Sequence, residues 1–71
     1  MFDNLMNIAQ HHSNKNESAM IAFNDAKRIA LNANYSYAGR RALFSIRHAV
    51  GVFHEDYKKA ESIFNELTTQ E

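Results

Sequence analysis

Apolar residues recur every three or four positions over the C-terminal half of the chain. The successive spacings are 3, 4, 3, 4, 3, 4 and 3, which is an unbroken a/d heptad pattern and is typical of a helix that packs along another helix. We call these eight residues the heptad seam: Leu43, Ile46, Val50, Phe53, Tyr57, Ala60, Phe64 and Leu67. The pattern predicts a helix over about 37–67, with Gly51 inside it at a cost of about 1 kcal/mol.

Two shorter helices are predicted before this segment. Apolar residues on one side of residues 4–11 predict a first short helix, and the polar stretch 13–16 ends it. An alanine-rich repeat with spacings of 4, 3, 4 and 3 predicts a second helix over about 17–33. Its members are Ala19, Phe23, Ala26, Ala30 and Ala33. So many small side chains on one side of a helix favour a close approach of two helix axes.

The composition agrees with helices alone. The chain has no Pro, two Gly and ten Ala in 71 residues. Strand-rich proteins use Pro and Gly heavily in their turns, whereas Ala is the strongest helix former. We therefore predict an all-α fold of three helices in a single domain over residues 1–71: a short N-terminal helix and a helical hairpin.

The length of the predicted third helix has a consequence for assembly. A helix of about 31 residues is about 46 Å long, but a compact domain of this size is only about 30 Å across. Either the first two helices lie end to end along it, or a second chain covers the excess. We expect a homo-oligomer, most simply a dimer. The oligomer seam would consist of Leu43, Ile46, Val50, Phe53, Tyr57, Phe64 and Leu67.

Charge is unevenly distributed although the formal net charge is zero. Residues 26–54 contain five basic and no acidic residues, so this segment carries +5; the remaining three basic and eight acidic residues give −5.

A basic and aromatic corner lies inside residues 26–54, where free N–H groups at a helix start, guanidinium groups and tyrosine rings favour a phosphate-bearing ligand. Its residues are Tyr35, Tyr37, Arg40 and Arg41, with Lys27 and Arg28 two turns earlier. The alternatives are an acidic protein partner, or a purely structural role in which the tyrosines cap the hairpin.

A second apolar side of the predicted long helix lies opposite the heptad seam. Phe44, His48 and Val52 fall on it at spacings of four. A helix that is apolar on two sides usually lies between two neighbours. These three residues are therefore a candidate partner face, unless they are buried within the molecule or its oligomer.

The sequence lacks the patterns that catalysis and metal binding require. There is no Cys, the four histidines lack metal-ligand spacing, and no Ser or Thr stands in a recognisable nucleophile and base arrangement. We expect neither an enzyme nor a bound metal or cofactor. With no apolar run of about 20 residues and no basic leader, we expect a cytoplasmic protein that does not bind membranes.

These observations favour a small, self-associating, non-enzymatic protein that binds another macromolecule as a regulator, inhibitor or adaptor. The alternative is a module that binds nucleic acid or a nucleotide through the corner at residues 35–41. A chain with a calculated pI of 6.9 is poorly suited to coating nucleic acid. The protein partner is therefore the leading hypothesis.

Overall fold

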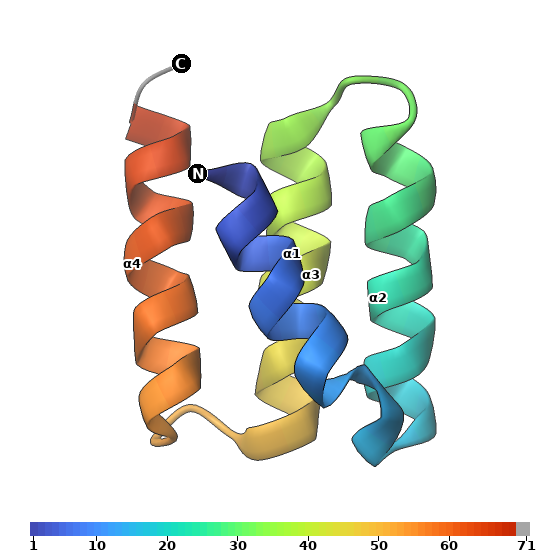
Figure 1. The fold of residues 1–71 in the computed structure, drawn as a ribbon, viewed down its shortest axis with the longest axis vertical. Helices are drawn as coiled ribbons and strands as arrows, with labels where there is room; N and C mark the ends of the chain where they lie inside the picture. The colour runs from blue at the N-terminus through green and yellow to red at the C-terminus, as the bar shows by residue number, and fades with distance from the viewer. Residues whose placement is uncertain (70–71) are drawn as a thin grey trace.

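Helices form almost all of residues 1–69, the part of the chain that the structure, a computed structural model, describes (Figure 1). This confirms the all-α prediction, but the described residues form four α-helices and not three. In chain order the elements are α1 (Phe2–His12), the short 3₁₀ helix η1 (Ser13–Lys15), α2 (Glu17–Ala30), α3 (Tyr35–Val50) and α4 (Glu55–Thr69). None of these helices is long and apolar enough to cross a bilayer.

The prediction of one continuous helix over 37–67 is wrong, because a turn at 51–54 divides it into α3 and α4. Gly51 has a φ of +87°, in the left-handed region that favours glycine, and its N–H donates to the carbonyl of Arg47 at 2.8 Å. His54 then starts α4, since its carbonyl accepts the Lys58 N–H (3.1 Å) and its Nδ1 accepts the Asp56 N–H (2.9 Å). Glycine thus ends a helix here instead of lying within one.

Asparagine side chains set the starts of the two central helices. The Asn16 side chain accepts the Ala19 N–H at 2.7 Å and caps α2. Asn34 caps α3 by accepting the Tyr37 N–H at 3.3 Å. The second helix stops at Ala30, three residues earlier than predicted, and the chain turns through Ala33 with a φ of 60°.

Helix α3 is the centre of the fold. It contacts α1, α2 and α4, whereas α2 and α4 do not contact each other within residues 1–69. Figure 1 shows α2, α3 and α4 side by side, with α1 crossing in front of α3. The Cα positions span 30 × 23 × 14 Å, so the molecule is a thin slab. No helix of the described chain covers the side of α3 that faces away from α1.

Small side chains allow the other helices to approach α3 closely. Its inner side buries Ala38, Gly39, Ala42, Ser45 and Ile46. A Cβ added at Gly39 would lie 3.1–3.3 Å from the side chains of Leu5 in α1 and of Phe64 and Leu67 in α4. The buried Ser45 hydroxyl donates to the carbonyl of Ala19 in α2 at 2.6 Å. Bulkier residues at these positions would push the helices apart.

The heptad seam packs largely inside a single chain, because α3 and α4 fold back against each other. Ile46, Tyr57 and Ala60 are buried, and Phe53 in the turn is 88% exposed. The half-buried members are Leu43, Val50, Phe64 and Leu67. The molecule is only 30 Å long in its longest dimension, so no described helix extends beyond the domain. The excess helix length that led us to expect a second chain is therefore absent.

Substitutions at two seam residues should separate their roles. Ile46→Ala should lower the free energy of unfolding by about 2–4 kcal/mol, because it leaves a cavity in the core. At concentrations where the chain is monomeric, Phe53→Asp should change it by no more than about 0.5 kcal/mol, because the ring is exposed on the single chain. Urea unfolding followed by circular dichroism measures both. A loss at Phe53 as large as that at Ile46 would mean that the ring is buried.

Candidate binding face on helix α3

Six polar and aromatic side chains share the uncovered side of α3. Their spacings of three and four place them opposite the small residues of the inner side. All are exposed or half-buried. We call this surface the arginine–aromatic face, and it consists of Tyr37, Arg40, Arg41, Phe44, Arg47 and His48. It joins part of the predicted basic corner to part of the predicted partner face, and it adds Arg47, which sequence reasoning had left out of any site.

Contacts along the face hold several of its side chains in place. The rings of Phe44 and His48 stack with centroids 4.5 Å apart and an interplanar angle of 14°. The guanidinium of Arg41 lies 5.6 Å from the ring centre of Tyr37 and donates to its hydroxyl at 3.3 Å. Ordering side chains before binding reduces the entropy that a partner must remove.

The arginines of the face have no acidic partner in the described structure. Helix α3 contains no Asp or Glu, and no carboxylate of residues 1–69 lies within ion-pair distance of Arg40, Arg41 or Arg47. Arg28 on α2 differs, since it pairs with Asp25 at 2.9 Å. Three guanidinium groups on one surface therefore keep donors for an external carboxylate or phosphate.

A small hollow lies where the face meets α4. Its volume is about 150 Å³, and it is lined by Arg40, Leu43, Phe44, Arg47 and Tyr57. The guanidinium of Arg40 also lies 5.9 Å from the ring centre of Phe64. An apolar depression between two arginines can hold an apolar side chain while the guanidinium groups bind charges on either side of it.

The remaining residues of the predicted corner lie elsewhere. The ring of Tyr35 packs against Phe2 with centroids 5.0 Å apart, beside a separate hollow of about 300 Å³ that Asp3 also lines. The ammonium group of Lys27 lies 5.4 Å from the ring centre of Phe23 on its own helix. The structure thus keeps Tyr37, Arg40 and Arg41 together but does not bring Tyr35, Lys27 and Arg28 into one site with them. Of the predicted partner face, Val52 lies beyond the end of α3 in the turn, partly exposed.

A histidine–aspartate pair that sequence reasoning missed joins α1 to α4. Nε2 of His12, which is 4% exposed, lies 2.7 Å from Oδ2 of Asp56. This hydrogen bond lowers the pKa of Asp56; burial opposes the shift, and the charges of His12, His54 and Lys59 add to it. The ring of His54 lies 5.6 Å from that of His12. Within residues 1–69 no three His, Asp or Glu side chains are placed to hold a metal ion.

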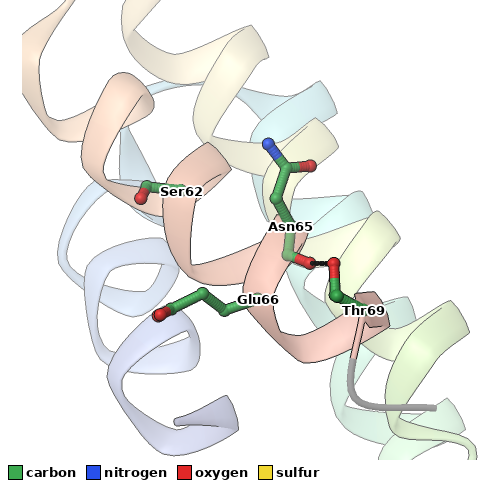
Figure 2. Close-up of a pocket in the computed structure, with 4 residues that line it drawn as sticks. All are labelled: Ser62, Asn65, Glu66 and Thr69. Carbon is green, nitrogen blue, oxygen red and sulfur yellow. Dashed lines mark hydrogen bonds between the residues drawn. The ribbon is translucent and has the colours of Figure 1, made fainter.

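A hollow on α4, shown in Figure 2, has no features of a binding site. Its volume is about 370 Å³, and its lining residues all come from α4: Ser62, Asn65, Glu66 and Thr69. The Thr69 hydroxyl donates to the carbonyl of Asn65 at 2.6 Å, as Figure 2 shows. Neither a cationic nor an aromatic group lines this hollow, so it offers little to fix a ligand.

Comparison with known proteins gave no match: no family model, no curated protein and no solved structure is significantly similar to this chain.

The His12–Asp56 pair predicts a pH dependence of stability. A carboxyl group whose pKa is lowered by folding stabilises the protein above its ordinary pKa of about 4, and this stabilisation is lost as the pH falls through the lowered value. Replacing His12 with Gln should move the pKa of Asp56 back towards its ordinary value. NMR titration of the Asp56 side-chain carboxyl in both proteins measures this directly. An unchanged midpoint would show that His12 is not the cause.

Proposed function

We propose that this protein acts by binding, and that its arginine–aromatic face docks onto an acidic surface of a partner protein. The observation that carries the proposal is a group of three arginines that have no acidic partner among residues 1–69. They lie beside the exposed rings of Tyr37 and Phe44, on a helix side that no other described helix covers. Such a surface attracts an acidic partner over a distance and gives it bidentate contacts on arrival.

The residue types of the face favour a protein partner over nucleic acid. Arginine and aromatic residues are enriched in protein interfaces, while lysine is depleted, and the face contains no lysine. The broad side of the slab measures 30 × 23 Å, which is comparable to the ~800 Å² that one partner buries in an interface of standard size. The zero net charge agrees, because proteins that coat nucleic acid are normally basic.

Binding without catalysis is the simpler role for these residues. His12 is the histidine with a carboxylate partner, but only 4% of its surface is exposed, so the pair is poorly placed to meet a substrate. Its more direct effect is to fasten α1 to the start of α4. We therefore propose a regulator, inhibitor or adaptor and not an enzyme.

Self-association, which the heptad seam led us to expect, is a further part of the proposal. It would have to use a surface other than the arginine–aromatic face, because a symmetric contact through that face would place arginines opposite arginines. The exposed Val52 and Phe53 in the turn after α3 form a neutral, apolar alternative. A dimer formed there would leave α3 free for its partner.

Photocrosslinking from the face tests the proposed function. A photoreactive phenylalanine analogue at Phe44 should form a covalent adduct with a protein in extract of the native host, whereas the same analogue at Ile21 should not. Ile21 is a suitable control because it is 55% exposed and lies on α2. The adduct should persist after nuclease treatment and disappear when Arg40→Glu and Arg47→Glu are added. An adduct that nuclease removes would favour nucleic acid and overturn the proposal.

Light scattering with size exclusion at micromolar concentration tests self-association. We expect a species larger than the 8.2 kDa single chain. Phe53→Asp should shift it towards the monomer without unfolding it, because a charge replaces an exposed apolar ring. Arg40→Glu should leave the assembly unchanged. A wild-type protein that stays monomeric at micromolar concentration would rule out the dimer. It would leave the proposed binding role of the arginine–aromatic face unaffected.

A further inference from the structure

The geometry of the arginine–aromatic face also restricts the form of its partner. Arg40 and Arg47 are seven residues apart on α3, hence on almost the same line along the helix and about 10.5 Å apart in axial rise. Both line the small hollow, and Leu43, Phe44 and Tyr57 complete its lining. The face therefore presents two positive groups with an apolar depression between them.

A helix matches this arrangement better than an extended strand. Two carboxylates seven positions apart on a helix share one side and have the same rise of about 10.5 Å. In a strand, three residues span about 10 Å, but side chains at an odd spacing point to opposite sides, and the even spacings of two and four give about 7 and 13 Å. A residue three or four positions after the first carboxylate of the helix would lie midway, opposite the hollow.

We propose that the occupant of this surface is an amphipathic helix of a partner protein, with two acidic residues seven positions apart and an apolar residue between them. The carboxylates bind the guanidinium groups of Arg40 and Arg47, and the apolar side chain enters the hollow against Leu43, Phe44 and Tyr57. The helix lies along α3 on the side opposite α1, where no described helix is in its way. This inference rests on the proposed function and specifies the partner's form.

Charge complementarity and the absence of competing carboxylates among residues 1–69 favour this partner. Within residues 1–69 neither Arg40 nor Arg47 is held by a carboxylate, so binding breaks no existing ion pair. The contact of Arg40 with the ring of Phe64 orients its guanidinium at the α4 edge of the hollow. Because both arginines line the same hollow, filling it also removes water from the charged pairs and strengthens them.

Labelled helical peptides test the inference by fluorescence anisotropy. The first peptide carries Glu at positions i and i+7 and Leu at i+4; the second has the same composition with the glutamates five positions apart, about 140° around the helix. The first should bind at least about tenfold more tightly, and either Arg40→Gln or Arg47→Gln should weaken it about tenfold. Arg28→Gln is the matched control, because Arg28 is 74% exposed on α2 and already paired.

Each outcome decides the inference. Equal binding of the two peptides, or none up to millimolar concentration, would overturn it, as would tighter binding of a single-stranded oligonucleotide of similar length. Circular dichroism of each variant confirms that the fold is retained. If these peptides fail while the arginine-dependent protein adduct at Phe44 forms, only the helical spacing is wrong. If the adduct is also absent, the proposed function fails with it.

Discussion

Close approach of the other helices to α3 is the constraint on which the rest of the structure depends. A chain of 71 residues has few large apolar side chains with which to form a core, so its helices must pack at short range to gain enough contact. Gly39 allows this close packing where α1 and α4 meet α3, and Ser45 allows it where α3 meets Ala19 of α2. The Ser45 hydroxyl makes a hydrogen bond within this contact, so burying this small polar residue does not destabilise the fold.

This packing also determines which surface is left for binding. Because α1, α2 and α4 all reach the same inner side of α3, its outer side can carry large charged and aromatic residues without disturbing the core. The linear segment 26–54, which lacks acidic residues, includes the whole of α3. A charge asymmetry along the sequence thus becomes an asymmetry in space, with arginines on one broad side of the slab.

The sequence predicts the helical content well, because helix formation depends on the local spacing of apolar residues and on composition. It does not locate the turn at 51–54, since the heptad spacing from Val50 to Phe53 to Tyr57 runs through it without interruption. The same periodicity is compatible with one long helix or with two helices that fold back on each other. Which of the two forms depends on the core that Ile46 and Tyr57 make with α1. The His12–Asp56 pair spans 44 positions and leaves no local pattern. Arg47 could have been found, because it lies seven residues after Arg40.

The turn at 51–54 connects the core to the binding face. It follows α3 directly. His54 at its end and Asp56 in the first turn of α4 both meet His12 from α1, so one polar cluster fixes how α4 returns along α3. The position of α4 in turn supplies Tyr57 to the hollow and Phe64 to the guanidinium of Arg40. A single long helix would have carried the same residues away from Arg40 and Arg47. The hollow between these arginines therefore exists because Gly51 allows the chain to reverse, and a site that looks local to α3 depends on the fold of the whole chain.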